Sequence, residues 1–249
     1  MPTRFVGLDL AAQVRRTGVA VLLEMEGEDG ALVLQVARTG ADDRMIIDLA
    51  RGSAKVAVDV PLGWPQGFVE LLAAHSAGTL DPPASTGDQW RRGMAMRETD
   101  LAVHARTGLT PLSVSTDRIA HPALRWAGIE ARLREAGTAV ARDGSGTICE
   151  VYPAAALRLW GLPHRGYKGA DGLHARRTLV GALGERFPQL DWAGHADASV
   201  RDDNVLDAVI AALLAREVAR GRAVPPLPAQ QGGALREGWI WLPRPPDRS

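Results

Sequence analysis

Four acidic side chains lie inside apolar segments of this sequence, where an ionised carboxylate is costly to bury. Burial without a partner costs several kcal/mol, so each acid needs a cation, a hydrogen-bond donor or water beside it. Three of these acids interrupt segments with the composition of buried strands, and the fourth lies inside an apolar helical segment. They are Asp9, Asp59, Glu150 and Asp207.

A divalent metal ion would satisfy such a set of acids. The chain has one cysteine and no pair of histidines at helical ligand spacing, so a zinc site is not supported. Oxygen-only ligands suit Mg²⁺ or Mn²⁺. Two such ions about 3.5 to 4 Å apart can activate a water and stabilise the leaving oxygen of a phosphodiester. The acids therefore indicate phosphodiester hydrolysis, although each of them is also compatible with a turn cap or an ion pair with arginine.

Asp203 lies four residues before Asp207, on the same face of the predicted helix. Two like charges at this spacing repel each other unless a cation lies nearby. Asp203 is therefore a further candidate metal ligand. The alternative is that Asp202 or Asp203 caps the N-terminus of the helix.

Two basic residues are candidates for substrate binding. Arg97 has the fork geometry to grip a phosphate through two hydrogen bonds, or it pairs with Asp100 on a solvated helix face. Lys168, one of only two lysines, lies in a glycine-flanked loop after Tyr167. It would neutralise a scissile phosphate, or it is an ordinary exposed loop lysine.

The elements that must position these residues alternate between strands and helices. Apolar segments separated by glycine-containing turns predict a three-stranded antiparallel meander over 5–12, 19–25 and 32–37. Two more strands are predicted at 55–60 and 147–153, and a short final strand at 238–243. Helical spacing and cap residues predict helices at 43–50, 68–77, 88–107, 122–136, 154–160, 173–187 and 202–216.

The composition is that of a folded domain. Of 249 residues, 46% are hydrophobic and 23% charged, which argues against predominant disorder. No repeat or composition break divides the chain, so we predict one domain over 1–249, with a helical elaboration at about 66–146.

Charge and hydropathy restrict the partners. Lys plus Arg and Asp plus Glu both number 29, so a nucleic-acid contact must come from a local patch rather than a global positive field. No apolar run reaches the roughly 18 residues of a membrane span, and no export segment precedes the first strand. We therefore expect a cytoplasmic protein without membrane contact, and the sequence leaves its oligomeric state open.

The order of these elements resembles the RNase H-like fold. Several segments more closely resemble the domain-of-unknown-function 429 family, described as predicted RNase H-like nucleases. Each segment is short, but together they follow the family order and span nearly the whole chain. They are residues 7–9, 58–63, 97–100, 150–154, 202–208 and 238–243.

The resemblance implies an α/β fold with an RNase H-like mixed five-stranded sheet, in which three antiparallel strands precede parallel ones and helices flank the sheet. It also implies a Mg²⁺- or Mn²⁺-dependent nuclease, with Asp9, Asp59 and Asp207 as catalytic metal ligands. The arrangement looks like that of Holliday-junction resolvases, which favour an acid where this chain has Asn204. Any extra ligand must therefore come from Asp203 or Glu150.

Two other functions remain open. Actin-like ATPases and small-molecule kinases also begin with a strand carrying Gly-x-Asp, but they need two duplicated halves and this chain shows no repeat. A catalytically inactive RNase H-like binding module is consistent with the net charge of zero.

Overall fold

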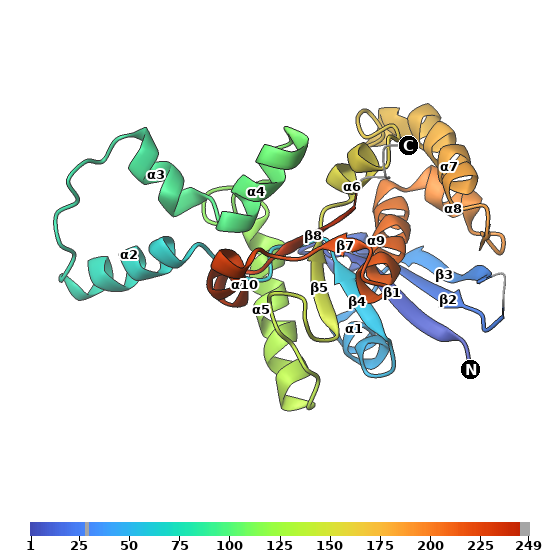
Figure 1. Cartoon of the computed structure of the whole chain (residues 1–249), viewed down its shortest axis with the longest axis horizontal. Coiled ribbons are helices and arrows are strands. Elements are labelled where there is room, and N and C mark those ends of the chain that lie inside the picture. The colour runs from blue at the N-terminus through green and yellow to red at the C-terminus, as the bar shows by residue number, and fades with distance from the viewer. Residues whose placement is uncertain (28–29, 245–249) are drawn as a thin grey trace.

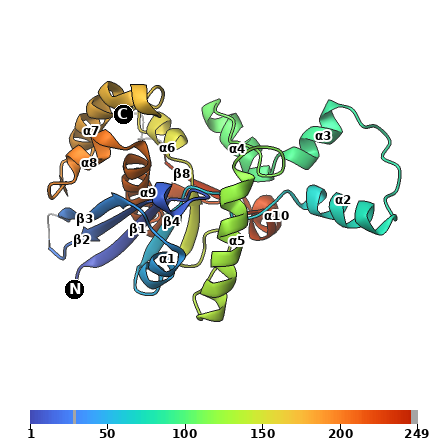
Figure 2. The same cartoon turned by 180° about the vertical axis from the view of Figure 1, so that it is seen from behind.

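The computed structural model describes residues 1–27 and 30–244, which form a mixed β-sheet flanked by helices (Figures 1 and 2). The sheet has eight strands in the order β6-β3-β2-β1-β4-β5-β8-β7. β1, β2 and β3 are antiparallel neighbours, whereas β4 and β5 continue from β1 as parallel strands. The strands are β1 (Thr3–Asp9), β2 (Gly18–Glu24), β3 (Leu32–Thr39), β4 (Lys55–Val58), β5 (Ile148–Val151), β6 (Leu190–Asp191), β7 (Ala223–Val224) and β8 (Ile240–Pro243).

The expectation of a five-stranded sheet is wrong, because three further strands extend the predicted five. The five lie together in the order β3-β2-β1-β4-β5. β8 corresponds to the predicted final strand and joins the sheet in parallel with β5. β6 and β7 contain two residues each, too few to show the alternation of apolar and polar residues by which a strand is recognised in sequence.

Helices cover both faces of the sheet. Alternate residues of β1 point to opposite sides: Phe5 belongs to the core beneath α9, and Val6 and Leu8 belong to the core beneath α1 and α5. None of the described helices is long and apolar enough to cross a bilayer. The helices are α1 (Asp43–Ala50), α2 (Gln66–Ala77), α3 (Asp88–Ala95), α4 (Glu98–Thr107), α5 (Ala120–Glu135), α6 (Pro153–Leu159), α7 (Leu173–Arg186), α8 (Ala196–Arg201), α9 (Asp203–Ala219) and α10 (Gln231–Glu237).

α9 lies in backbone contact with the centre of the sheet. A Cβ atom at Gly7 of β1 would collide with backbone atoms of Ala208 and Ala212, and one at Gly18 of β2 would collide with the carbonyl of Asn204. Ala211 on the same helix is fully buried. Only glycine on the strands and small residues on the helix permit this approach, which fixes the position of α9 relative to β1.

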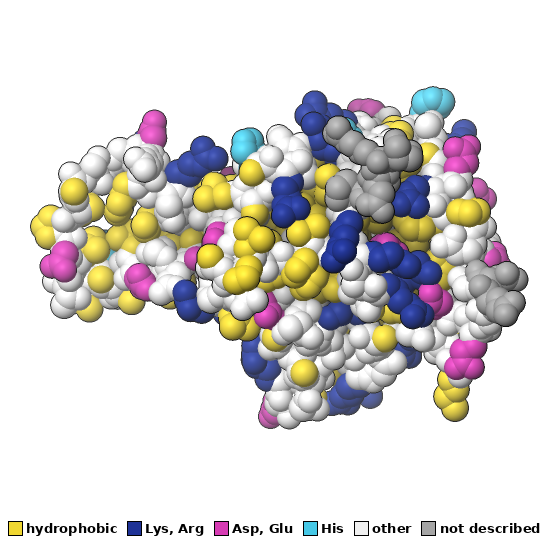
Figure 3. Space-filling model, viewed as in Figure 1, with side chains coloured by type: hydrophobic (Ala, Val, Ile, Leu, Met, Phe, Trp, Pro, Cys, Tyr) yellow, Lys and Arg dark blue, Asp and Glu magenta, His cyan; other side chains and the backbone are white. Residues whose placement is uncertain are grey.

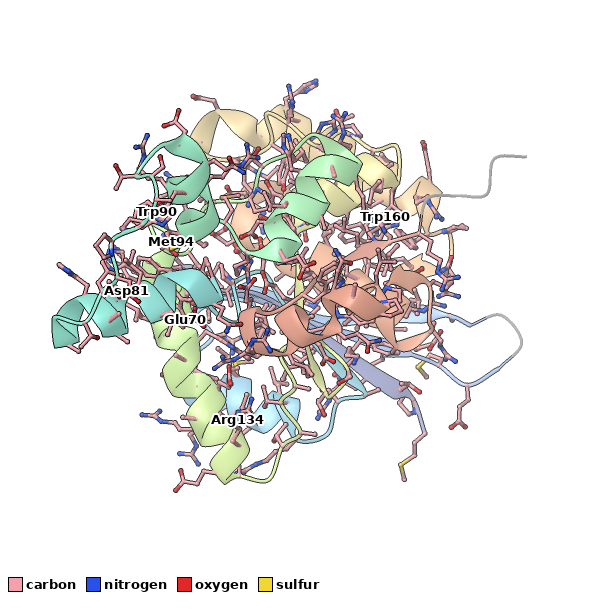
Figure 4. The ribbon with its side chains drawn as sticks, turned by 60° about the vertical axis from the view of Figure 1, so that its left-hand side comes forward. Glu70, Asp81, Trp90, Met94, Arg134 and Trp160 are labelled. Carbon is pink, nitrogen blue, oxygen red and sulfur yellow. The ribbon has the colours of Figure 1, made fainter. Side chains whose placement is uncertain are left out.

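A helical arm formed by α2, α3 and their connection projects away from the sheet (Figure 1). Neither helix has a buried residue, and hydrophobic side chains gather along the arm (Figure 3). Figure 4 places Trp90 and Met94 on this arm, far from Trp160, the C-cap of α6. The two helices meet where Gly67 faces Met94, since a Cβ at Gly67 would lie 3.0 Å from Cε of Met94.

The predicted helix over 88–107 is wrong, because the structure divides it into α3 and α4. Met96 is extended, with φ −116° and ψ 133°, and Arg97 is the N-cap of α4. The carboxylate of Asp100 accepts the backbone N–H of Arg97 at 2.9 Å. The break allows Arg97 to reach the interior, as described below. Helical periodicity did not reveal it, because periodicity does not show such a contact.

Candidate metal centre

Three aspartates converge where β1 and β4 end. Asp9 is the last residue of β1, Asp59 directly follows β4, and Asp207 lies within α9. β1 and β4 are parallel neighbours, so their carboxyl ends coincide, and the backbone N–H of Asp59 donates to the carbonyl of Leu8 at 2.8 Å. One carboxylate oxygen from each aspartate lies within 4.8 Å of the other two. We call Asp9, Asp59 and Asp207 the acidic triad.

Asp207 is fully buried and only partly satisfied. Its Oδ1 accepts a hydrogen bond of 2.9 Å from the hydroxyl of Tyr167. Its Oδ2 pairs with the ammonium of Lys168 and accepts no other hydrogen bond from the described residues. A divalent cation at this oxygen would lie beside the ammonium or displace it.

The other two aspartates are poorly stabilised as anions. Burial, together with the neighbouring charge of Asp9, raises the pKa of Asp59 from 3.8 to about 8. Burial also raises the pKa of Asp9 to about 6, and Asp203 and Asp202 add to this rise while Lys168 opposes it. The triad therefore requires more positive charge than the protein provides if all three groups are to be ionised at neutral pH.

The donor set and its spacing fit a hard divalent cation. Two oxygens that bind one Mg²⁺ at about 2.1 Å lie at most about 4.2 Å apart. The separations of up to 4.8 Å within the triad need only a small closure to reach this value. The triad offers carboxylate oxygens alone, which suits Mg²⁺ or Mn²⁺ better than a softer metal.

Lys168 lies at the edge of the triad, although about half of its side chain is exposed. Besides its contact with Asp207, the ammonium lies 5.4 Å from the centre of the Tyr167 ring. Gly166 and Gly169 enclose the Tyr-Lys pair, with φ of 73° and 76°, in the left-handed region that favours glycine. The structure therefore brings Lys168 to the acids.

The acids at the start of α9 have separate partners. Asp202 is the N-cap, and its Oδ1 accepts the backbone N–H of Asn204 at 2.9 Å. Asp203 is the first residue of the helix, and its Oδ2 accepts the backbone N–H of Gly169 at 3.0 Å. Asp202 therefore caps α9. Asp203 instead holds the loop that carries Lys168, and it lies close enough to raise the pKa of Asp9.

The structure does not bring Glu150 into the triad. Its two carboxylate oxygens accept hydrogen bonds of 2.7 and 2.8 Å from the guanidinium of Arg97, and Oε2 also accepts the backbone N–H of Leu62 at 3.0 Å. Because these donors already satisfy both oxygens, Glu150 is not placed to bind a metal ion held by Asp9, Asp59 and Asp207.

Arg97 has a buried environment that differs from the expected substrate contact. Only 1% of its side chain is exposed, and the guanidinium binds Asp100 at 2.9 Å as well as Glu150. The pairing with Asp100 is the predicted alternative, although it occurs in the interior rather than on a solvated face. Arg97 therefore joins α4 to β5. The N–H groups of its guanidinium are already used in these contacts and are not free to bind a phosphate.

Two cavities adjoin the triad. One of about 490 Å³ contains Asp59, Tyr152, Tyr167 and Lys168 in its wall, and one of about 760 Å³ contains Asp9, Asp59, Lys168 and Asp203. Asp59 therefore lines both cavities and Asp9 lines one, whereas the buried Asp207 lines neither. A ligand of several atoms fits beside the acids in either cavity.

Sequence reasoning missed the role of Tyr167, which was noted only as the neighbour of Lys168. Its side chain is 2% exposed and binds Asp207 directly. The one sequence signal was an aromatic and a basic residue enclosed by two glycines. That pattern shows a constrained loop but not the helix against which the loop packs.

A family model described as "Protein of unknown function (DUF429)" matches residues 7–231 of this chain. Neither the curated proteins nor the solved structures gave a match in the corresponding comparisons.

Proposed function

The chain belongs to the DUF429 family, and we propose that it is a divalent-metal-dependent nuclease that hydrolyses phosphodiester bonds of nucleic acid. The observation that carries this proposal is the convergence of Asp9, Asp59 and Asp207, with an oxygen from each within 4.8 Å of the others. These residues come from two adjacent parallel strands and one helix packed on them, so the arrangement is rigid.

The order of the central strands supports an RNase H-like fold. β3-β2-β1-β4-β5 places three antiparallel strands beside two parallel ones, with the acids at the ends of β1 and β4 and on a late helix. β6, β7 and β8 are then additions at the two edges of this unit. The resemblance in strand order and in the position of the acids is the basis for assigning nucleic acid as the substrate.

The acidic triad would hold Mg²⁺ or Mn²⁺, which supplies positive charge beside the scissile phosphate and makes a nearby water more acidic. Tyr167 orients Asp207 through its hydroxyl, and Asp203 holds the loop that carries Lys168. The ammonium of Lys168, which contacts Asp207, would neutralise a non-bridging phosphate oxygen. In this arrangement Tyr167, Asp203 and Lys168 each have a separate task.

Metal titration and cleavage together test this proposal. We expect Mn²⁺ to bind by calorimetry and to promote cleavage of labelled DNA or RNA, and we expect D207N to lose both properties. D171N is the matched control, because Asp171 is exposed and lies outside both cavities. Absence of cleavage on single-stranded, duplex and junction substrates, with no Mn²⁺ binding, would overturn the proposal.

A binding module without catalysis is the second candidate, and the contact between Lys168 and Asp207 favours it. An ammonium that permanently neutralises Asp207 would remove the need for a metal ion. In that case D9N would raise the melting temperature of the protein, because it removes charge repulsion, and saturating Mn²⁺ would leave the melting temperature unchanged. A nuclease would instead be stabilised by Mn²⁺.

A further inference from the structure

The two cavities beside the acidic triad are adjoining lobes of one cleft. We call the cavity of about 490 Å³ the inner lobe and that of about 760 Å³ the outer lobe. Both are lined by Asp59 and Lys168 on the triad side and by Leu112, Arg118 and Ile119 from the segment before α5. A ligand that occupies both lobes must therefore pass between this segment and the triad.

The inner lobe suits a flat, largely apolar group. Its wall includes Val60, Pro61, Leu112 and the half-buried ring of Tyr152. Leu112 is 43% exposed, although it is a large hydrophobic residue beside a cluster of charges. The volume lies within the range of about 300 to 1,000 Å³ that is usual for small-ligand pockets, and it accommodates one nucleoside.

Three arginines line the same cleft without a direct ion pair. Arg16 lines the outer lobe, Arg165 lines the inner lobe, and Arg118 lines both. All three are exposed, and within the described residues none of their side chains forms a salt bridge or a hydrogen bond. By contrast, Arg97 and Arg125 are bound to carboxylates. Free guanidinium groups on both sides of the triad form a path for consecutive phosphates.

We propose that the cleft binds a single-stranded oligonucleotide, with one base in the inner lobe, a phosphate at the triad and flanking phosphates against the three arginines. This inference rests on the proposed function, which supplies the phosphate at the triad. A single strand is required because the bases of a duplex are stacked and paired, and one of them would have to be flipped out to enter the inner lobe. The arginines bind the backbone, so we expect little dependence on base sequence.

Fluorescence anisotropy tests the inference separately from catalysis. The probe is a fluorescein-labelled oligothymidylate of twenty nucleotides, free or annealed to its complement, and Ca²⁺ replaces Mn²⁺ to suppress cleavage. We expect the free strand to bind at least about tenfold more tightly than the duplex, since the duplex must first give up stacking and pairing. An oligouridylate of the same length determines whether RNA replaces DNA.

Two pairs of variants locate the binding site. R165A should weaken single-strand binding and lower the slope of log affinity against log salt by about 0.7, the effect of losing one phosphate contact. R177A is its control, because Arg177 is exposed and lines neither lobe. L112A should weaken binding by about threefold to tenfold through lost apolar contact. L124A is its control, because Leu124 is 62% exposed on α5 and also lies outside both lobes.

The outcomes separate this inference from the proposed function. Three results would overturn the inference, whatever the nuclease assay shows. They are equal binding of single strand and duplex, no binding of either, and equal effects of R165A and R177A on binding. Selective single-strand binding that R165A and L112A weaken, without cleavage in Mn²⁺, would support the inference and overturn the proposed catalysis. If duplex and single strand were cleaved at equal rates, the nuclease proposal would stand. The proposal that the cleft binds a single strand would be rejected.

Discussion

Tyr167 and Asp207 are both buried, and the tyrosine hydroxyl donates a 2.9 Å hydrogen bond to Oδ1 of the aspartate. This bond fixes the orientation of the carboxylate, whose Oδ2 pairs with the ammonium of Lys168. A hydrogen bond to a metal ligand restricts its rotation and thereby prepares it for the ion. The relationship therefore predicts that a loop residue affects how tightly the triad would bind a metal ion.

We expect Y167F to weaken Mn²⁺ binding by about tenfold to a hundredfold, because groups that orient metal ligands typically have effects of this size. The phenylalanine ring keeps the packing of the loop. Isothermal titration calorimetry would measure the dissociation constant. Y152F is the control, since the hydroxyl of Tyr152 makes no hydrogen bond with another described residue. Equal affinities of Y167F and the unaltered protein would contradict the orienting role of Tyr167.

The stability of the metal-free protein should fall as the pH rises from about 4 to about 8. The folded-state pKa of Asp59 is raised to about 8 and that of Asp9 to about 6, whereas both lie near 3.8 when unfolded. Over this interval the folded protein holds protons that the unfolded chain has lost, so rising pH favours unfolding by on the order of a few kcal/mol. Denaturant unfolding at several pH values measures the slope, which should level off above about pH 8.

D59N should remove most of that pH dependence, because the amide does not titrate, whereas D171N should leave it unchanged. Mn²⁺ should reverse the trend, since metal binding requires ionised carboxylates and therefore strengthens as the pH rises. A metal-free protein whose unfolding free energy is constant between pH 5 and 8 would show that the triad is ionised without a metal ion.

R97A should lower the free energy of unfolding by about 3–5 kcal/mol, because it leaves Glu150 and Asp100 buried without a counter-ion. R91A is the control, because Arg91 pairs with Asp88 on the surface, and such pairs contribute about 1 kcal/mol or less. R97K tests whether the fork of the guanidinium is needed. If R97K retained full stability but lost oligonucleotide binding, Arg97 would be a substrate-binding residue after all.

G7A should destabilise the protein by about 1–3 kcal/mol or more, because the added methyl group would collide with the backbone of α9. It should also weaken Mn²⁺ binding, since moving α9 moves Asp207 relative to Asp9. G128A is the matched control: nothing lies within 4 Å of a Cβ at Gly128, and it lies inside α5, where alanine adds about 0.5–1 kcal/mol of stability. Thermal unfolding and calorimetry measure both effects, and a G7A protein as stable as G128A would contradict the close packing.

The family prediction is confirmed by the match over residues 7–231. The central strands were predictable because each has several consecutive apolar residues bounded by turns, and Asp9 and Asp59 stood out as acids at the ends of such segments. Asp207 was recognisable because an acid past the first turn of an apolar helix has no capping role. For these strands and acids, the residues immediately around them in the sequence were enough to predict the secondary structure that contains them.

Other features depended on contacts that local patterns do not contain. The sequence shows that Glu150 is an acid in a strand, but its pairing with Arg97 joins residues 53 positions apart. The break between α3 and α4 has the same origin, since it allows Arg97 to reach the interior. The two-residue strands β6 and β7 are stabilised by their neighbours rather than by their own composition.

The close packing of α9 on β1 also has a consequence for how the chain is made. β1 is synthesised about 200 residues before α9, the helix that covers it and carries the last member of the triad. Contacts between segments so distant in sequence form slowly. The nascent chain therefore carries an uncovered central strand through most of its synthesis and completes the acidic triad only when α9 is made, so a product truncated before α9 has no assembled triad.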